Sequence, residues 1–235
     1  MAIELGLVMP VYNEVECIVD VVESWRKELT RLNIDYMMII LNDGSRDGTA
    51  EALKCFVGYE RITISNKENS GHGPTILLGY FKAVQMAQWV FQCDSDNEMK
   101  PQHFSGLWEE RERFDALFGT RKSRHQNFGR SLISFVSRLT VRLLFGDGVI
   151  DVNTPYRLIR SNVLCKIIEQ IPKNTFAPNL IISGALAKAR MRIYNHPVPH
   201  QGRKTGTVSI GKLKLWKAAM TAFYQTIRCS FVIKI

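Results

Sequence analysis

The feature that most restricts the fold is a regular alternation of short apolar runs and amphipathic segments over the first hundred residues. The apolar runs are typical of buried parallel strands, and the segments between them show helical spacing. Alternation of this kind predicts βαβ units, in which helices cover both faces of a mostly parallel central sheet, and therefore an α/β fold. The expected strands are Leu5–Pro10, Tyr36–Leu41, Ile62–Ser65 and Trp89–Cys93, and the expected helices are Glu14–Leu32, Thr49–Val57 and Thr75–Ala87.

The alternation loosens after residue 100, but the chain shows no internal repeat and no low-complexity tract. We therefore predict one domain over residues 1–211, with halves at 1–100 and 101–211, followed by a basic amphipathic helix within residues 212–235. In the second half we expect the helices Pro101–Arg113, Gly129–Phe145, Val163–Gln170, Asn179–Ala189 and Lys212–Thr226, and the strands Ala116–Gly119, Thr154–Ile159 and Arg192–His196.

Composition argues against a disordered chain and shows where the charge lies. Apolar residues make up 46% of the 235 residues, which is ordinary for a globular protein with a buried core. The net charge of +9 is uneven, because residues 1–100 hold 9 Lys or Arg against 15 Asp or Glu, whereas residues 170–235 hold 11 and none. A basic segment of this kind favours an anionic partner: phosphates, nucleic acid or acidic lipid head groups. A drift of charge without a partner is the alternative.

The cysteines and the apolar segments indicate where in the cell the protein is expected to reside. Five scattered cysteines without a CxxC pair argue against a disulfide framework or a zinc site and favour a reducing, cytoplasmic location. The N-terminus lacks the pattern of a signal peptide, and no stretch reaches the roughly 18 uncharged apolar residues of a membrane span. Basic residues interrupt the last apolar segment, so we expect that it could lie on a membrane but not cross it.

Three polar motifs each follow an apolar run: Pro10–Glu14, Asn42–Thr49 and Asp94–Glu98. Each motif alone could be a surface turn, since Asp-Gly pairs are common in turns. In an open parallel sheet, however, ligands bind beyond the carboxyl ends of the strands. Three such motifs in succession therefore predict one shared pocket.

The third motif has the spacing of a metal site. Asp94, Asp96 and Glu98 alternate along the chain, and side chains two apart in an extended segment point the same way. Their oxygens suit Mg²⁺ or Mn²⁺, ions that usually keep several waters and bridge substrate phosphates. A solvated acidic loop is the alternative.

The motifs PVYNE, LNDGSRDGT and CDSDNE, in this order and spacing, resemble the nucleotide-binding half of family 2 glycosyltransferases. Within that family the chain is most similar to polyprenyl-phosphate sugar transferases such as dolichyl-phosphate mannose synthase. The resemblance implies a GT-A fold, which is Rossmann-like, with residues 1–100 as the nucleotide-sugar-binding half and residues 101–211 as the acceptor-binding half.

The resemblance also implies roles for the motif residues. Asp94 would contact the ribose or the metal, Asp96 would bind the metal that bridges the diphosphate, and Glu98 would be a third ligand. The residues that would bind the donor nucleotide are Pro10, Tyr12, Glu14, Asp43 and Asp94. His72 falls in a glycine-containing loop that lies near the nucleotide in the family, where it could also be a spectator.

In the second half, the resemblance implies an acceptor site built from cations. Gly119-Thr120-Arg121 resembles a GTR motif that places an arginine near the phosphates, and Arg203 lies in a loop that resembles R-x-x-G-x-S. The predicted catalytic residues are Asp96, Arg121 and Arg203. The residues predicted to bind the acceptor phosphate are Arg121, Arg130, Ser134 and Arg203. Asp151 and Asn153 are both candidates to meet the sugar.

Some of these features have plainer explanations. Arg130 and Ser134 belong to a polar stripe that recurs every four residues, as in an ordinary amphipathic helix, and residues 202–207 could be a simple basic surface loop. The final helix, with Trp216 and Phe223 beside lysines, fits either an anionic membrane surface or a packed helix with a solvated basic face.

We therefore expect an inverting, metal-dependent hexosyltransferase that uses a UDP- or GDP-sugar and a polyprenyl phosphate. It would be peripheral at the cytoplasmic face of the membrane, alone or with a membrane-embedded partner. An acceptor phosphate is already anionic at neutral pH, so this reaction needs arginines rather than a general base. One rival is a transferase for a glycan acceptor in surface polysaccharide assembly. Another is a non-catalytic module that binds nucleotide sugars or RNA, although the tail lacks clustered aromatics and no nucleic acid is expected as a partner.

Overall fold

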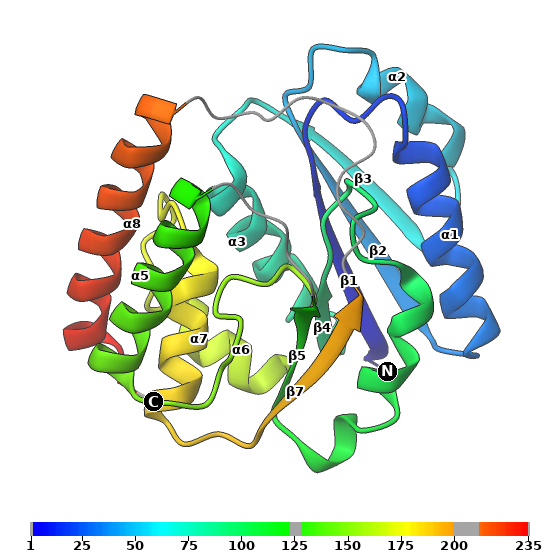
Figure 1. The fold of residues 1–235 in the computed structure, drawn as a ribbon. Helices are drawn as coiled ribbons and strands as arrows, with labels where there is room; N and C mark the ends of the chain where they lie inside the picture. Colours follow the sequence, from blue (N-terminus) through cyan, green and yellow to red (C-terminus); the bar gives the residue numbers. More distant parts are fainter. Residues whose placement is uncertain (1, 123–127, 200–211, 235) are drawn as a thin grey trace.

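In the computed structural model, the described residues form one seven-stranded sheet with helices on both faces (Figure 1). The structure describes residues 2–122, 128–199 and 212–234, with side chains throughout these ranges except at 122–135, 212–216 and 218. The order of the strands across the sheet is β3-β2-β1-β4-β6-β5-β7. The strands are β1 (Ile3–Val11), β2 (Tyr36–Asp43), β3 (Ile62–Lys67), β4 (Ala87–Gln92), β5 (Ala116–Lys122), β6 (Arg157–Arg160) and β7 (Ile193–Pro199).

Six of the seven described strands point the same way. β1 pairs in parallel with β2 and β4, β2 with β3, and β5 with β7, whereas β6 runs antiparallel to both β4 and β5. The predicted α/β fold with a mostly parallel central sheet is therefore confirmed. Because the carboxyl ends of β1, β2, β4 and β5 meet at one edge, the loops that follow them lie where such sheets bind ligands.

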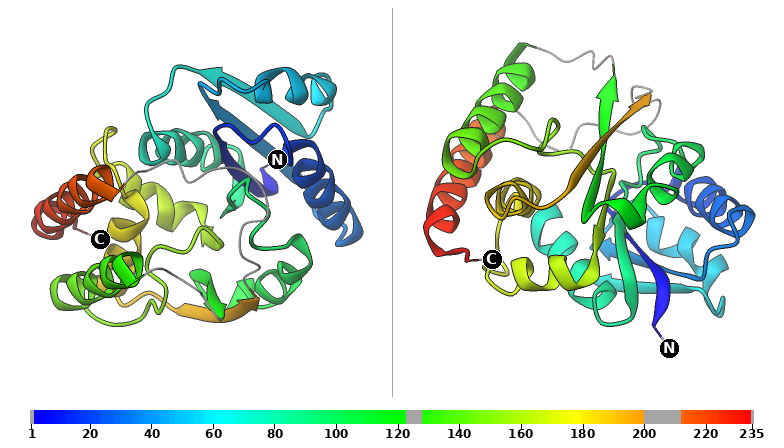
Figure 2. Two further views of the ribbon diagram at one scale, coloured as in Figure 1. Left: turned by 45° about the horizontal axis from the view of Figure 1, so that its top comes forward. Right: turned by 90° about the horizontal axis from the view of Figure 1, so that it is seen from below.

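Helices form a layer on each face and a further layer outside one of them (Figure 2). The first face carries α1 (Ile18–Arg31), α2 (Thr49–Ala52), η1 (Leu53–Phe56), η2 (Pro101–His103) and α4 (Ser105–Trp108), with η3 (Arg111–Arg113) before β5. The second face carries α3 (His72–Ala83), α6 (Ser161–Ile168) and α7 (Pro178–Lys188). The outer layer is α5 (Phe128–Phe145) and α8 (Lys212–Val232), which pack on α7 and on each other.

An aromatic cluster joins the two halves of the chain beneath the carboxyl edge. The ring of Phe91 on β4 lies 5.2 Å from that of Trp25, 4.6 Å from that of Phe104 and 4.8 Å from that of Tyr156. All four side chains are buried. Tilted and edge-on aromatic pairs at these distances are favourable contacts, so the cluster holds Phe104 and Tyr156 of the second half against Trp25 and Phe91 of the first.

Several predicted boundaries were wrong, for identifiable reasons. The helix expected from Glu14 begins at Ile18, because the backbone N–H groups of residues 13–15 bond to side chains of the loop after β2. The helix expected to reach Ala87 ends at Ala83, because Ala87 pairs with Ile3 in the sheet. The expected helix Pro101–Arg113 is three short pieces, and β6 starts at Arg157 rather than at Thr154.

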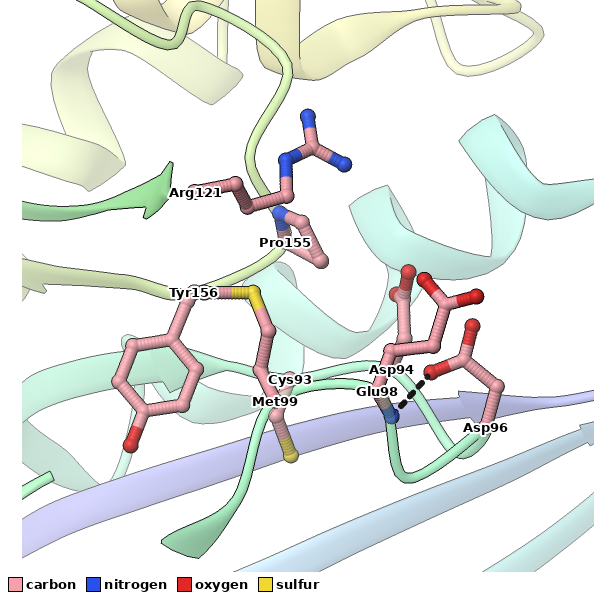
Figure 3. A pocket seen from close by; sticks show the side chains of 8 residues that line it. All are labelled: Cys93, Asp94, Asp96, Glu98, Met99, Arg121, Pro155 and Tyr156. Atoms are coloured by element: carbon pink, nitrogen blue, oxygen red, sulfur yellow. Dashed lines mark hydrogen bonds between the residues drawn. The ribbon is translucent and has the colours of Figure 1, made fainter. Parts of the chain in front are cut away.

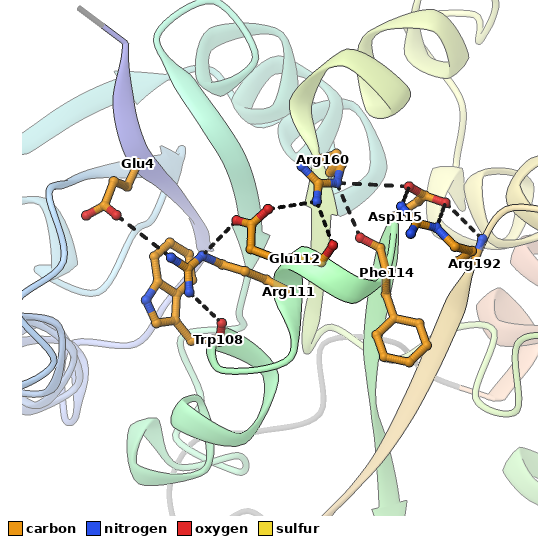
Figure 4. Close-up of polar contacts among 8 residues, drawn as sticks. All are labelled: Glu4, Trp108, Arg111, Glu112, Phe114, Asp115, Arg160 and Arg192. Carbon is orange, nitrogen blue, oxygen red and sulfur yellow. Dashed lines mark hydrogen bonds and ion pairs between the residues drawn. The ribbon is translucent and has the colours of Figure 1, made fainter.

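A chain of charged side chains crosses the amino edge of the sheet, opposite the binding edge (Figure 4). Arg160, which ends β6, contacts Glu112 at 3.0 Å and stacks 4.4 Å above the ring of Trp89. Each exposed ion pair contributes only about 0–1 kcal/mol to the stability of the fold. The network nevertheless connects residues at the ends of strands from both halves of the chain. Its members are Glu4, Arg111, Glu112, Asp115, Arg160 and Arg192.

Candidate functional site

Hydrogen bonds between side chains and backbone groups connect the loops after β1 and β2. The backbone N–H of Asn13 donates to Ser45 Oγ at 2.9 Å, and Asn13 Oδ1 accepts the N–H of Arg46 at 2.8 Å. Thr49 Oγ1 accepts the backbone N–H of Glu14 at 2.9 Å. Asn13 has a φ of 55°, a left-handed conformation that asparagine tolerates. The first two motifs therefore form a single rim, in which Glu14 is buried.

Asp43, at the end of β2, orders the loop that leads into α3. Its carboxylate pairs with Lys67 and accepts the backbone N–H groups of Ser70 and Gly71, both at 2.9 Å. Burial opposes ionisation of Asp43, but hydrogen bonds from Lys67, Ser70 and Thr75 outweigh it and hold the pKa below its ordinary value. Gly71 has a φ of 91°, which favours glycine at this turn. Asp43, one of the residues predicted to bind the donor nucleotide, thus also fixes the loop before α3.

A cavity of about 430 Å³ opens between these loops at the carboxyl edge. This volume lies within the range of small-molecule sites. All five residues predicted to bind the donor nucleotide line it, so the structure brings them together. His72, at the start of α3, also lines the cavity, with Nε2 3.9 Å from Asp94 Oδ1. The lining residues are Pro10, Val11, Tyr12, Glu14, Asp43, Asn69, Gly71, His72, Thr75, Asp94, Ser95, Asp96 and Phe176.

A smaller cavity of about 30 Å³ adjoins the first, since Asp94 and Asp96 line both (Figure 3). Glu98 and Arg121 also line it, and Arg121 reaches it from β5 in the second half of the chain. The backbone N–H of Glu98 donates to Asp96 Oδ1 at 3.2 Å, which folds the acidic motif into a tight turn. Carboxylates from one half and a guanidinium from the other therefore meet at one place.

The acidic motif offers the hard oxygen ligands that Mg²⁺ or Mn²⁺ prefers. Such ions are usually held by one or two carboxylates plus substrate phosphates rather than by a complete protein cage. Within the described ranges, no three His, Cys, Asp or Glu side chains are arranged to hold a metal ion by themselves. Asp94 and Asp96 thus fit a metal shared with a diphosphate, and the third ligand expected at Glu98 stays a prediction.

A buried polar network stands behind Asp94. Gln92 Oε1 accepts hydrogen bonds from the Tyr80 hydroxyl at 2.6 Å and from Asn179 Nδ2 at 2.9 Å, and Gln92 Nε2 faces Asp94 Oδ1 at 3.4 Å. All three supporting side chains are buried. Burial raises the pKa of Tyr80 far above its ordinary value, so its hydroxyl remains a donor. The network therefore orients the amide of Gln92 towards the acidic motif.

Arg121 is held in place by Asp151. Its Nε and Nη2 donate to the two carboxylate oxygens at 2.7 and 2.9 Å, and the Arg121 side chain is only 7% exposed. Bidentate pairs of this kind are among the strongest and best-oriented ion pairs. The structure thus brings together two residues that the sequence analysis treated separately. Asn153, the other candidate for the sugar, is exposed.

Arg157 is a structural residue whose extent of burial was not predicted. It is fully buried, and its guanidinium donates to the backbone oxygens of Val152, Thr154 and Asn179 at 2.7 to 3.2 Å. Burial lowers the pKa of Arg157. These bonds fix the loop that carries Asp151 against α7, and so fix Arg121 indirectly.

Sequence reasoning also missed Gln92 and Phe176. The one available signal was a polar Gln92 inside the apolar run WVFQC, directly before the acidic motif. No local pattern points to Phe176, because the loop before α7 reaches the donor cavity only through the tertiary fold. Arg130 and Ser134 lie on α5, with side chains outside the described residues, and Arg203 also lies outside them.

The outward faces of α5 and α8 expose apolar side chains on adjacent helices. Leu143 is 75% exposed and Phe231 is 78% exposed. The inward side of α8, which includes Ala222 and Thr226, is buried. No helix in the described part of the chain has the length and apolar character needed to cross a membrane. The members of this apolar surface are Val136, Leu139, Leu143, Met220, Phe223, Tyr224, Phe231 and Val232.

Residues 7–166 match the family model described as glycosyl transferase family 2. Undecaprenyl-phosphate 4-deoxy-4-formamido-L-arabinose transferases from Proteus mirabilis and Pectobacterium atrosepticum are 24% and 25% identical to the chain. The alignments cover 96% of this chain and 67% of each relative, so the chain spans about two thirds of their length.

Two solved structures share the fold. Mannosyl-3-phosphoglycerate synthase from Rubrobacter xylanophilus has a TM-score of 0.72 at 13% identity, over 96% of this chain and 73% of that one. Glucosyl-3-phosphoglycerate synthase from Mycobacterium tuberculosis, in complex with Mn²⁺, UDP and glucosyl-3-phosphoglycerate, has a TM-score of 0.68 at 16% identity, over 99% and 81%. These similarities, together with the mixed sheet, establish a GT-A-like α/β fold.

Proposed function

Since the chain belongs to glycosyl transferase family 2 and is a glycosyltransferase, we propose that it transfers a hexose from a UDP- or GDP-sugar to a polyprenyl phosphate. The transfer would depend on Mg²⁺ or Mn²⁺ and invert the anomeric carbon. The observation that carries this proposal is the position of Asp94 and Asp96, between the nucleotide-sized cavity and Arg121. The relatives named undecaprenyl-phosphate sugar transferases support the acceptor, and the neighbour that holds Mn²⁺ and UDP supports the donor and the metal.

The donor nucleotide would occupy the larger cavity. Pro10, Tyr12 and Glu14 would flank the base and ribose, and Asp43 would accept a hydrogen bond from the base. Because Asp43 is ionised and anchored by Lys67, it offers a fixed acceptor rather than a mobile one. This rigidity supports base recognition without reorganisation when the donor binds.

The leaving diphosphate would lie over Asp94 and Asp96. These two carboxylates would hold the metal ion, which offsets the negative charge that grows on the departing nucleoside diphosphate. Asp151 occupies the Nε and Nη2 edge of Arg121, so a phosphate would meet this side chain through Nη1 and the second N–H of Nη2. Arg121 would thereby stabilise charge at a position fixed before the reaction begins.

The acceptor side favours a phosphate over a sugar hydroxyl. A phosphate monoester has its second pKa near about 6 and is already a nucleophilic anion at neutral pH, so it needs no general base. Cations must instead hold it in line with the anomeric carbon, and we assign this role to Arg121, Arg130, Ser134 and Arg203. The absence of any Asp or Glu from residues 170–235 of the sequence supports this choice.

A lipid acceptor requires contact with a membrane, and the apolar surface of α5 and α8 would supply it. Lys217 and Arg228 lie on the exposed side of α8, among Met220, Phe223, Tyr224 and Phe231. Apolar side chains interleaved with cations suit the interface of a membrane with anionic lipids. We place the protein at the cytoplasmic face, as a peripheral protein or with a membrane-embedded partner.

A transfer assay tests the proposed function. The purified chain would be incubated with MnCl₂ or MgCl₂, a panel of radiolabelled UDP- and GDP-sugars, and undecaprenyl phosphate in detergent. We expect label from one donor to enter the organic phase, and Asp96→Asn and Arg121→Ala to reduce the rate at least about 100-fold, as when one charge-stabilising group is removed. The anomeric configuration of the glycosyl phosphate in the intact product lipid, determined by NMR and compared with that of the donor, would test inversion.

The assay also separates the alternatives. Hydrolysis or binding of one donor without labelled lipid would support a glycan acceptor within the same family. If no donor binds or reacts in the presence of either metal, the proposed function fails.

A further inference from the structure

The loop between α6 and α7 supplies one wall of the donor cavity. Phe176 lies in this loop, lines the cavity together with His72, Asp94 and Asp96, and remains 41% exposed. Its ring is a flat apolar surface contributed by the second half of the chain to a site otherwise built from the first half. An exposed aromatic side chain is therefore available beside the cavity.

The loop rests directly on the first turn of α3. A Cβ atom at Gly73 would lie 2.2 Å from the carbonyl oxygen of Thr175 and 2.3 Å from that of Phe176, so only glycine allows this approach. Thr175 is fully buried, and its hydroxyl is the buried side-chain polar atom without a hydrogen-bond partner among the described residues. Burial of a hydroxyl without a hydrogen-bond partner lowers the stability of the folded state. The loop position is therefore imposed by its neighbours and not by the side chain of Thr175.

The second support comes from α8. The backbone N–H of Phe176 donates to Gln225 Oε1 at 2.8 Å, across 49 residues of sequence. Gln225 is partly buried, and the α8 residues on either side of it along the inward face, Ala222 and Thr226, are buried. Ala222 belongs to a small core with Phe145 and Leu180, which holds α8 against α5 and α7. The hydrogen bond thus links the outer helix layer to the rim of the donor cavity.

We propose that Phe176 contacts the donor through its ring and that Gln225 on α8 is a positioning residue for Phe176. This inference rests on the proposed function of the cavity as a donor site. An aromatic ring can pack on the face of a base or of a hexose, and it does so well only if its backbone is fixed. The C-terminal helix is then part of the donor site as well as an outer surface, and anything that seats or displaces α8 changes donor affinity.

The test compares variants by isothermal titration with UDP and with GDP in MnCl₂, and then with the matching nucleotide sugars. Phe176→Ala should weaken binding about 10-fold, because it removes the aromatic contact. Gln225→Leu, which keeps the bulk and removes the acceptor, should weaken binding about 3- to 10-fold. Gln225→Glu keeps an acceptor oxygen at the same reach and should bind more tightly than Gln225→Leu. If Phe176→Ala weakens the binding of the nucleotide itself, the ring contacts the base. If it weakens the binding of the nucleotide sugar alone, the ring contacts the sugar.

Two controls separate positioning from general stability. Thr221→Ala removes a hydroxyl that donates to the Lys217 carbonyl within α8, and it should leave nucleotide affinity unchanged. Amide hydrogen exchange at Phe176, measured without ligand, should accelerate in Gln225→Leu and not in Thr221→Ala. Thermal unfolding of all variants shows that they are folded at the temperature of the titration.

The outcomes are distinguishable. If the wild-type protein binds a nucleotide and Gln225→Leu binds it equally well, the inference is overturned while the proposed function stands. If the Phe176 amide exchanges faster and affinity is unchanged, the hydrogen bond exists but does not position a donor contact, which also overturns the inference. Failure of the wild-type protein to bind UDP or GDP overturns the proposed function, and this inference with it.

Discussion

At the scale of single residues, the amide of Gln92 connects the acidic motif to a buried network that spans three elements. Gln92→Met keeps the length of the side chain and removes both the donor facing Asp94 and the acceptor for Tyr80 and Asn179. Residues behind metal ligands typically affect metal affinity or activity by about 10–100-fold. We expect the Mn²⁺ concentration for half-maximal activity to rise at least about 10-fold, as measured by metal titration of the transfer rate.

Tyr80→Phe is the gentler comparison, because it removes one hydroxyl and leaves the ring and Gln92 in place. It should shift the metal requirement in the same direction by a smaller factor. Thermal unfolding checks that both variants are folded, since an unpaired buried group costs about 1–3 kcal/mol. An unchanged metal requirement in folded Gln92→Met would show that the network supports the fold alone.

The residues of the site were predictable where a motif carries them and not elsewhere. The predicted donor residues converge on one cavity, because each lies at or just after the carboxyl end of a strand and these ends lie at the same edge of the sheet. Phe176 and Gln225 could not be found in this way, since their roles depend on contacts between segments that no local pattern relates. The pairing of Arg121 with Asp151 likewise depends on the course of the chain after α5.

At the scale of elements, α3 makes two close contacts through glycine, and a pair of variants separates their effects. A Cβ at Gly73 would meet the backbone of residues 175 and 176, whereas a Cβ at Gly79 would meet the side chains of Val8 at 2.3 Å and Leu41 at 2.8 Å. Both Gly73→Ala and Gly79→Ala should lower the free energy of unfolding, by about 1–3 kcal/mol each.

The two variants should differ in ligand binding. Gly73→Ala should also weaken nucleotide binding, because it displaces the loop that carries Phe176, whereas Gly79→Ala should leave it unchanged. Chemical denaturation and nucleotide titration measure the two effects. Equal loss of nucleotide affinity in both variants would mean that binding follows overall stability and not the position of the loop.

Element types were more predictable than element boundaries. Every strand expected in the first hundred residues is present. β1, β2 and β4 are apolar runs that are mostly buried, whereas β3 is a partly exposed strand at the edge of the sheet. The start of α1 was misplaced, since the side chains of Ser45, Asp47 and Thr49 capture backbone N–H groups that the sequence alone assigns to a helix. The reversed direction of β6 was not foreseen, because strand direction depends on the long connection through α5.

At the scale of the whole molecule, stability should depend on pH through Asp43. Its pKa is lower in the folded state than in the unfolded chain, where it is about 3.9, so its ionised form stabilises the fold. This contribution is complete above the unfolded pKa and is lost as the pH falls through the folded pKa. We expect Asp43→Asn to be less stable than the wild type at neutral pH, by about 2 kcal/mol.

The difference between the two proteins should stay constant from pH 7 to about 5 and shrink below about pH 4, as measured by denaturant unfolding at each pH. Comparison with the variant cancels the contributions of other titrating groups, which include His103, whose pKa burial lowers. A difference that does not change down to pH 3 would contradict an ionised, paired Asp43.

The apolar surface of α5 and α8 makes a separate prediction about membranes. Leu143→Asp and Phe231→Asp should each reduce co-sedimentation with vesicles that contain phosphatidylglycerol about 10-fold or more, because burial of such a side chain contributes about 1.5–3 kcal/mol. Val57, which is 71% exposed on the opposite side of the sheet, is the matched control, and Val57→Asp should bind vesicles as the wild type does. An equal loss of vesicle binding in all three variants would show that this surface is not the membrane-binding surface.

The two halves of the molecule share one sheet, one aromatic cluster and one ionic network, and they meet at the acidic motif. In the proposed function, a donor bound by the first half would lie against cations of the second. We propose that those cations bind the phosphate of the acceptor.

The measurement that tests this claim most directly is the initial rate of sugar transfer to undecaprenyl phosphate and to undecaprenol, with the same labelled donor, metal and detergent. Only the phosphate distinguishes the two acceptors. We expect transfer to undecaprenyl phosphate to be at least about 100-fold faster than to undecaprenol, with the preference reduced in Arg121→Ala. Equal transfer to both lipids, or transfer to neither while a glycan hydroxyl is labelled, would contradict this claim.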